Sequence, residues 1–165
     1  HYGIKSVCFR ITNPYGPRSQ MKNSGYSIIN WFIRQAMDGR DITVFGEGSQ
    51  LRDYIYIDDL IQGIVTGVIN SKTDGKILNL GSGSKTSFYQ MAQTVISTVG
   101  SGQLRKIPWP KNYDNFETGD FCADISLITS LTGWTPSTTL ENGIRATVDY
   151  YRKYREYYWQ SAVLQ

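Results

Sequence analysis

The chain has 165 residues, of which 40% are hydrophobic and 19% charged, and a formal net charge of +3. This balance is ordinary for a single globular domain and contains no concentrated basic patch, so we expect no nucleic-acid partner. No apolar run is long enough to span a membrane and no segment resembles a signal peptide, which predicts a cytoplasmic protein without a membrane partner. Two distant cysteines, Cys8 and Cys122, favour buried thiols, although a disulfide between them stays open.

Strand-like and helix-like patterns alternate along the chain. Residues 5–11 form an apolar run typical of a buried strand, and the loop 12–18 follows it at the edge where open α/β sheets place their ligands. Asp58 and Thr139 are predicted to be helix N-caps. Strands are predicted at 51–57, 76–80 and 104–107, an extended stretch at 120–124, and helices at 24–38, 58–69, 87–99, 126–131 and 139–154.

The stretch 44–60 combines a turn, a strand pattern and a helix start. Alternation over 51–57 predicts that Arg52, Tyr54 and Tyr56 share one face of the strand. A guanidinium beside two aromatic hydroxyls suits a ligand with a flat ring and an anionic group, because guanidinium binds phosphate oxygens in bidentate fashion. The competing interpretation is an amphipathic strand whose polar side faces water.

Several motifs of nucleotide chemistry are incomplete. Residues 81–86 read GSGSKT and lie between a strand and a helix, but a phosphate-binding loop requires glycine where Ser84 stands, so a plain turn is the better interpretation. The glycine fingerprint of a dinucleotide site is missing, and no tyrosine is followed four residues later by lysine. The single histidine, His1, argues against a Ser-His-Asp triad and against a histidine-based metal site.

The acidic residues of the chain have simple structural interpretations. Asp53 and Asp58 are predicted on opposite strand faces, and Asp58 or Asp59 fits a helix cap better than a catalytic role. Glu117 and Asp120 flank Gly119 in a loop, where they either bind a sugar hydroxyl or are solvated.

Four segments of the sequence, taken together, resemble one family. They are RITNPYGPR at 10–18, VFGEGSQLRDYIYIDD at 44–59, NLGSG at 79–83 and GWTP at 133–136. They are similar, in order and spacing, to motifs of the extended short-chain dehydrogenase/reductases, specifically the nucleotide-sugar epimerases and dehydratases that include UDP-glucose 4-epimerase. The resemblance implies an α/β fold in which residues 1–165 form the C-terminal, substrate-binding portion of an extended Rossmann-type protein. That portion comprises its last parallel strands and a small mixed α/β domain.

The resemblance also implies roles for individual residues. Asn13 is similar to an asparagine that contacts the sugar-nucleotide diphosphate, Arg52 to an arginine that grips it, and Tyr54 to an aromatic residue that lines the site. Asp120 is similar to an aspartate that contacts the nucleotide ribose, and Thr12 to a position near the nicotinamide of NAD.

One position departs from the family pattern. Glu117 stands where many members carry a second phosphate-binding arginine, and a carboxylate there would repel a diphosphate. The resemblance therefore leaves open whether another cation, such as Lys106, Lys111 or Arg18, takes over that contact, or whether the loop is arranged differently.

Several expectations follow from the resemblance. The NAD loop and the catalytic Tyr and Lys would lie in an N-terminal half that this chain lacks, so we expect no catalysis by the chain alone. Apolar surface around residues 7–9 and 77–78 should be exposed where the missing half would pair, which favours self-association or a homodimer. The alternative is a stand-alone, non-catalytic module that binds a nucleotide-sugar or a protein. The sugar, the base and the reaction type are not determined by these motifs.

Overall fold

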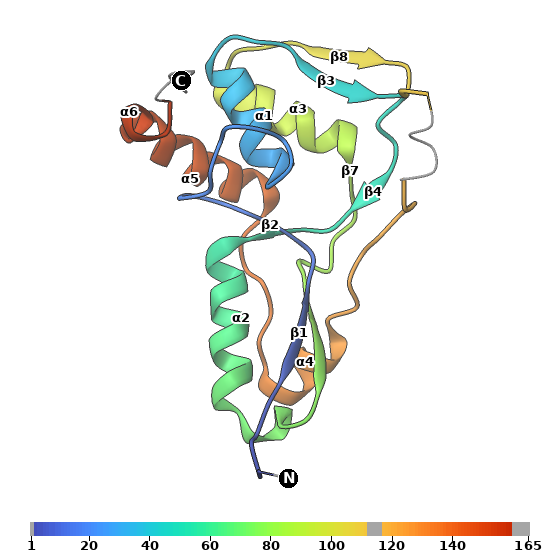
Figure 1. Cartoon of the computed structure of the whole chain (residues 1–165), viewed down its shortest axis with the longest axis vertical. Coiled ribbons are helices and arrows are strands. Elements are labelled where there is room, and N and C mark those ends of the chain that lie inside the picture. Colours follow the sequence, from blue (N-terminus) through green and yellow to red (C-terminus); the bar gives the residue numbers. More distant parts are fainter. Residues whose placement is uncertain (1, 112–116, 160–165) are drawn as a thin grey trace.

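The structure is a computed structural model, and it describes residues 2–111 and 117–159. Four strand pairs and the helices around them make up two parts that are stacked along the long axis (Figure 1). The strands are β1 (Cys8–Ile11), β2 (Asn13–Tyr15), β3 (Ile42–Phe45), β4 (Leu51–Arg52), β5 (Tyr54–Tyr56), β6 (Ile77–Leu80), β7 (Thr86–Ser87) and β8 (Leu104–Ile107). The helices are α1 (Ile28–Met37), α2 (Ile57–Ile69), the 3-10 helix η1 (Ser71–Thr73), α3 (Phe88–Val99), α4 (Ser126–Thr132), α5 (Leu140–Lys153) and α6 (Arg155–Tyr158).

Parallel strand pairs dominate the topology. β1 pairs with β6, β2 with β5, and β3 with β8, all in parallel, while β4 and β7 are antiparallel. The first pair lies with α2 and α4 in the lower part of Figure 1, and the third pair lies with α1, α3 and α5 in the upper part. The β2–β5 pair connects the two parts. This mixed α/β arrangement confirms the predicted fold class.

Two hydrophobic cores lie on either side of β5, and its sequence explains why. Successive residues of a strand point to opposite faces. Tyr54 and Tyr56 accordingly belong to the upper core, with α1, α3 and α5, whereas Ile55 belongs to the lower core, with Leu78, Leu80 and Trp134. The predicted alternation is therefore correct for the tyrosines. The predicted strand 51–57 is interrupted at Asp53, which separates β4 from β5.

Side-chain caps define the start of three helices. The hydroxyls of Ser27, Ser87 and Thr139 accept hydrogen bonds from backbone N–H groups of α1, α3 and α5, and Ser87 forms a full capping box with Gln90. The predicted cap at Asp58 is wrong, because α2 begins at Ile57 and follows Tyr56 directly. Asp58 instead lies in the first turn of α2, where its negative charge interacts favourably with the positive end of the helix dipole.

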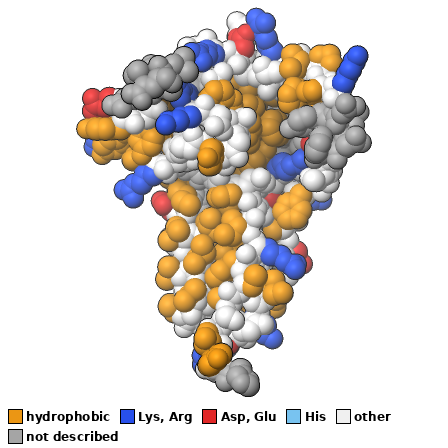
Figure 2. All heavy atoms as spheres, viewed as in Figure 1, with side chains coloured by type: hydrophobic (Ala, Val, Ile, Leu, Met, Phe, Trp, Pro, Cys, Tyr) orange, Lys and Arg blue, Asp and Glu red, His pale blue; other side chains and the backbone are white. Residues whose placement is uncertain are grey.

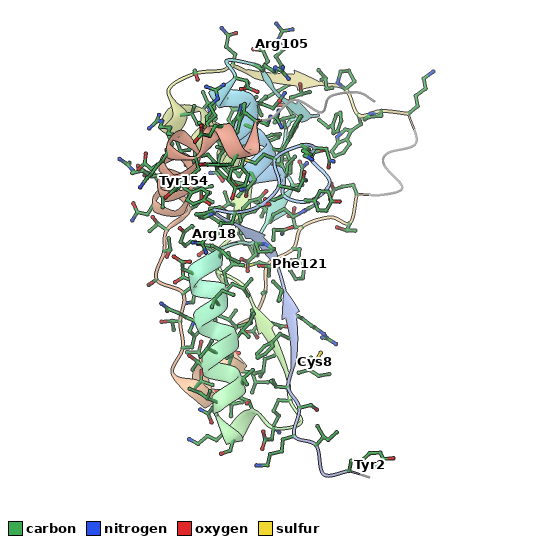
Figure 3. The ribbon with its side chains drawn as sticks, turned by 60° about the vertical axis from the view of Figure 1, so that its left-hand side comes forward. Tyr2, Cys8, Arg18, Arg105, Phe121 and Tyr154 are labelled. Carbon is green, nitrogen blue, oxygen red and sulfur yellow. The ribbon has the colours of Figure 1, made fainter. Side chains whose placement is uncertain are left out.

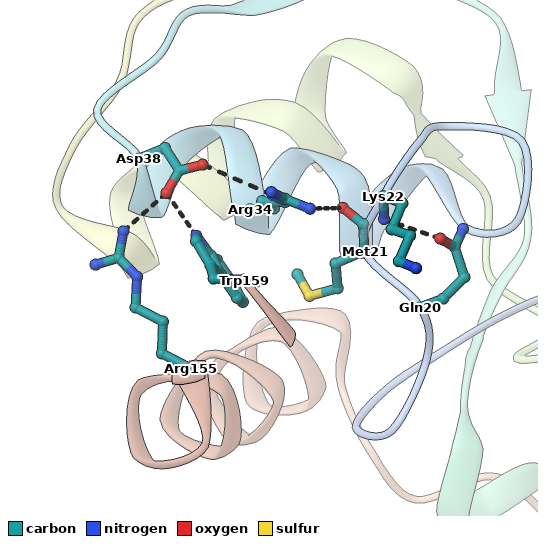
Figure 4. A network of polar contacts seen from close by, with 7 residues as sticks. All are labelled: Gln20, Met21, Lys22, Arg34, Asp38, Arg155 and Trp159. Atoms are coloured by element: carbon teal, nitrogen blue, oxygen red, sulfur yellow. Dashed lines mark hydrogen bonds and ion pairs between the residues drawn. The ribbon is translucent and has the colours of Figure 1, made fainter. Parts of the chain in front are cut away.

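Polar contacts attach the C-terminal helices to α1 (Figure 4). Asp38, at the end of α1, accepts hydrogen bonds from Arg155 Nη2 at 2.8 Å and from Trp159 Nε1 at 2.6 Å. Arg34 approaches the same carboxylate at 3.7 Å and donates to the carbonyl of Met21 at 2.8 Å. The loop before α1 and the end of the described chain are thus fastened to one helix.

Strand β1 differs from the prediction of a buried strand. Its residues are largely exposed, because among the described residues its only paired strand is β6. Cys8 lies on the side of β1 away from α2 and is exposed (Figure 3), and Cys122 is half-buried, so the expected buried thiols are wrong and both cysteines are free. Ile77 is exposed as expected, but Leu78 is fully buried in the lower core.

Two further predictions about secondary structure are wrong in detail. Residues 120–124 adopt no regular strand, and α1 starts four residues later than the predicted 24. Residues 160–165 lie outside the described part of the chain. Within the part of the chain that the structure describes, none of the helices has both the length and the apolar character needed to cross a bilayer.

Candidate functional site

A pocket of about 350 Å³ opens where β1 ends and α1 begins. Its wall includes Thr12 and Asn13, which directly follow β1, together with Tyr54 of β5 and residues 24–29, which run from the loop before α1 into its first turn. The carboxyl ends of parallel strands are the usual ligand sites of open α/β folds. Three of the five predicted site residues therefore meet at one pocket, at the edge where the sequence predicted it.

Backbone pairing brings Asn13 and Tyr54 together. They are direct partners in the parallel register of β2 and β5. The side-chain amide of Asn13 donates to the Asp53 carbonyl at 2.9 Å, and its backbone N–H donates to the same oxygen at 3.2 Å. These bonds orient Asn13 at the pocket wall, although the residue itself is exposed.

Tyr54 carries a polar group into the apolar upper core. Its side chain is only 5% exposed, and its hydroxyl oxygen is buried with no hydrogen-bond partner among the described residues. Burial raises the pKa of this phenol well above its ordinary value, so the hydroxyl keeps its proton. Tyr54 also lines a second pocket of about 210 Å³, whose wall is rich in serine and threonine from residues 82–86 and 136–140. Buried hydroxyls normally have a partner, so Tyr54 is a group that a ligand or a water molecule would satisfy.

Arg52 does not line the pocket that Asn13 and Tyr54 share, and its guanidinium is engaged within the chain. Its Nη1 atom donates to the carbonyls of Gly119 at 2.6 Å and Leu51 at 2.9 Å, and its Nη2 atom forms an ion pair with Glu117. Glu117, the residue that departs from the family pattern, thus contacts Arg52, the proposed phosphate-binding cation, directly. The phosphate-binding role of Arg52 stays a prediction, and any anion would have to replace these partners.

Asp120 holds the backbone beside Arg52. Its Oδ1 atom accepts a hydrogen bond from the backbone N–H of Leu51 at 2.7 Å, and the N–H of Phe121 donates to the Leu51 carbonyl at 3.0 Å. This contact explains Asp120 structurally, and its predicted ribose contact stays a prediction. Lys106, one of the candidate substitute cations, pairs with Glu47 and lies over the ring of Tyr89.

Asp53, Asp58 and Asp59 lie in three different environments. Asp58 is exposed, while Asp59 is buried and accepts hydrogen bonds from Ser137 and Thr138. Asp53 is fully buried and ties three segments together. It accepts from Ser82 N and Oγ at 2.7 Å, and from the backbone N–H groups of Gly83 and Ala123 at 3.1 Å.

This carboxylate explains the loop that resembles a phosphate-binding motif. A Cβ atom on Gly81 would lie 2.4 Å from Asp53 Oδ2, so the loop needs glycine to approach the carboxylate closely. The plain-turn interpretation therefore holds for residues 81–85, which connect β6 to the short strand β7 in front of α3 and wrap an internal carboxylate.

Two buried residues that no sequence motif marked, Asn30 and Tyr151, anchor the loop that follows β2. Asn30, buried in α1, donates to the Gly16 carbonyl at 2.7 Å and to the Tyr151 hydroxyl at 3.2 Å. Tyr151 in turn donates to the Ser19 carbonyl at 2.7 Å, and its burial raises its pKa to about 12. These bonds hold the loop after β2 in place. An asparagine inside an apolar helix pattern is the one signal in the sequence that indicates such an anchor.

Comparison with known proteins identifies the family. A model of the NAD dependent epimerase/dehydratase family matches residues 1–81. UDP-glucuronic acid decarboxylase 1 of Xenopus tropicalis is 35% identical over 94% of this chain and 35% of its own length. UDP-N-acetyl-alpha-D-glucosaminuronate decarboxylase of Bacillus cytotoxicus is 28% identical over 92% of this chain and 47% of its own length.

Solved structures of nucleotide-sugar epimerases have a similar fold. The crystal structure of UDP-glucose 4-epimerase with UDP-glucose from Thermotoga maritima superposes with a TM-score of 0.83 at 26% identity, covering 93% of this chain and 48% of that one. UDP-glucuronic acid 4-epimerase from Bacillus cereus, in complex with UDP-glucuronic acid and NAD, gives a TM-score of 0.75 at 28% identity, covering 90% and 45%. The chain thus spans about half the length of these structures. Its fold and its motifs identify it as a member of the NAD-dependent epimerase/dehydratase family of extended short-chain dehydrogenase/reductases.

Proposed function

We propose that this chain is the nucleotide-sugar-binding portion of an NAD-dependent epimerase or dehydratase. Relatives that act on nucleotide sugars match it over nearly all of its length, and two solved relatives contain a UDP-sugar. The ligand would be a sugar joined to a nucleoside diphosphate. Binding groups far from the reacting carbon contribute to catalysis by positioning that carbon, which is the contribution this chain would make.

The observation that carries the proposal is the hydroxyl of Tyr54, which has no hydrogen-bond partner within residues 2–111 and 117–159. A buried hydroxyl without a partner has a substantial free-energy cost, and the residue that carries it lines a pocket together with Thr12 and Asn13. A nucleotide-sugar offers many hydroxyl and phosphate oxygens that would accept a hydrogen bond from it. The pocket therefore suits a polar ligand better than an apolar one.

Arg52 is the proposed cation for the diphosphate. It lies two residues before Tyr54, in the adjoining strand β4, and 83% of its side chain is shielded from solvent. A guanidinium in such a place is only weakly screened by water, so a diphosphate that replaces its present partners gains charged hydrogen bonds.

NAD would be shared between this chain and the rest of the fold. Thr12, whose hydroxyl lies 3.5 Å from Asp53 Oδ1, would contact the nicotinamide end, and the glycine-rich loop for the pyrophosphate is not part of this sequence. When bound, NAD would accept and return a hydride. Thr12 would orient its ring, and the chain by itself would not catalyse the reaction.

The rest of the fold would pack against α2 and β1. Ile61, Val65 and Val68 on α2 are each at least half exposed, and hydrophobic side chains gather over this lower part of the molecule (Figure 2). Glycines 63 and 67 on the opposite side of α2 allow Trp134 and Phe9 to approach the helix closely. One side of α2 is therefore fully packed, and the other is an apolar surface that would be covered by a further layer.

Isothermal titration of the 165-residue chain with UDP and UDP-glucose tests the proposed function. Arg52→Ala should weaken UDP binding by about tenfold or more, because a hydrogen bond to a charged group contributes about 1.5–3 kcal/mol. Tyr54→Phe should weaken UDP-glucose binding by about fivefold through loss of one hydroxyl. Arg105→Ala is the matched control, since Arg105 forms an exposed ion pair with Asp41 at the far end of the molecule from Cys8 (Figure 3). The proposed function would be wrong if the wild-type chain bound neither ligand, or if Arg52→Ala and Arg105→Ala behaved alike.

A further inference from the structure

A closed set of hydrogen bonds surrounds the guanidinium of Arg52. Glu117 Oε1 accepts from Arg52 Nη2 and also from the backbone N–H of Gly119 at 3.1 Å, while the Gly119 carbonyl accepts from Arg52 Nη1 at 2.6 Å. Arg52 and Glu117 are therefore hydrogen-bonded to each other, and both are hydrogen-bonded to the backbone of Gly119. Their side chains are 17% and 25% exposed, so water screens the attraction only partly.

The carboxylate of Glu117 occupies the same donors that a phosphate would use. Guanidinium presents its N–H groups in a planar fork that fits two oxygens of one anion, whether that anion is a carboxylate or a phosphate. Both terminal nitrogens of Arg52 already have acceptors within the chain. A second anion cannot add to this arrangement without repelling Glu117 or displacing it.

We propose that Glu117 is an internal competitor for the phosphate-binding guanidinium and sets the affinity of the site for diphosphates. The inference rests on the proposed function. With no nucleotide bound, Glu117 neutralises Arg52, and a diphosphate has to displace this carboxylate before it reaches the guanidinium. The nucleoside part of the ligand, which carries no charge, is unaffected. Glu117 is thus a residue that determines affinity without contacting the reacting atoms.

The surrounding backbone makes this proposal testable by one substitution. The backbone N–H of Leu51 donates to Asp120 Oδ1 at 2.7 Å, and the Leu51 carbonyl accepts from the N–H of Phe121 at 3.0 Å. Neither hydrogen bond involves Glu117. In Glu117→Gln the amide oxygen still accepts from the Gly119 N–H, so the loop keeps its contacts while the negative charge is removed. The variant therefore separates the effect of charge from the effect of structure.

The experiment compares two ligands, UDP and uridine, by isothermal titration of the 165-residue chain. We expect Glu117→Gln to bind UDP about tenfold more tightly than wild type, because the competing charge-assisted contact is removed. Uridine, which lacks phosphate, should bind both proteins equally. Glu141→Gln, which removes the charge from an exposed ion pair with Arg145 on α5, is the matched control and should change neither ligand.

The outcomes distinguish this inference from the proposed function. If wild type binds UDP and Glu117→Gln binds it equally or more weakly, the competitor role is wrong while the proposed function stands. If Glu117→Gln strengthens UDP and uridine binding alike, the residue acts on the structure of the site and the competitor role is again wrong. If no variant binds UDP, the proposed function and this inference fail together.

Discussion

Replacement of Asp53 should cost a large part of the stability of the fold. Its carboxylate is fully buried and accepts four hydrogen bonds of 3.1 Å or less, three of them from the backbone N–H groups of Ser82, Gly83 and Ala123. Asp53→Ala leaves those three donors unpaired beside a small cavity. Each buried, unpaired donor costs about 1–3 kcal/mol, and partial access of water would satisfy some of them. We therefore expect a loss of about 3–5 kcal/mol in the free energy of unfolding.

Urea denaturation followed by circular dichroism measures this loss. With a slope of about 2 kcal/mol per molar urea, the midpoint should fall by about 2 M. Asp53→Asn keeps the size and one acceptor oxygen, so its loss should be intermediate. The control is Asp74→Ala, which removes a partly exposed ion pair with Lys5 and should cost less than about 1 kcal/mol. A loss for Asp53→Ala as small as that of the control would refute the view that this carboxylate ties the three segments together.

Two further predictions concern pH and association. Burial by itself raises the pKa of Asp59, but hydrogen bonds from Ser137 and Thr138 outweigh it and hold the pKa below its ordinary value of 3.8. The advantage of wild type over Asp59→Asn in urea denaturation should therefore be constant above about pH 5 and shrink as the pH falls through the lowered pKa, and an advantage that grows in acid would contradict this. In size-exclusion chromatography the wild-type chain should elute as a species larger than a monomer, because the exposed apolar face of α2 associates between copies. Val65→Lys should shift the elution towards the monomer, whereas the control Gln62→Lys should not. A monomeric wild type would argue against association.

Much of the architecture could be predicted from local patterns. The helices α2, α3 and α5 and the strands β6 and β8 lie within a few residues of their predicted limits, because their apolar periodicity and capping residues act over one or two turns. The alternation that separates Tyr54 from Ile55 likewise needs only the two-residue period of a strand. Burial was less predictable, since it depends on how many neighbours a strand has, and β1 has one among the described residues.

The site divides in the same way. Thr12, Asn13 and Tyr54 were predicted from family motifs, and backbone pairing between β2 and β5 brings them to one pocket. The partnership of Arg52 with Glu117, 65 residues apart, has no signature in local spacing and appears only when the chain is folded. Local sequence patterns are enough to place most helices and strands and the motifs they carry, because those preferences act between neighbours along the chain. Which charged side chains meet follows from the folded arrangement alone, because Coulomb attraction and burial depend on distances in space.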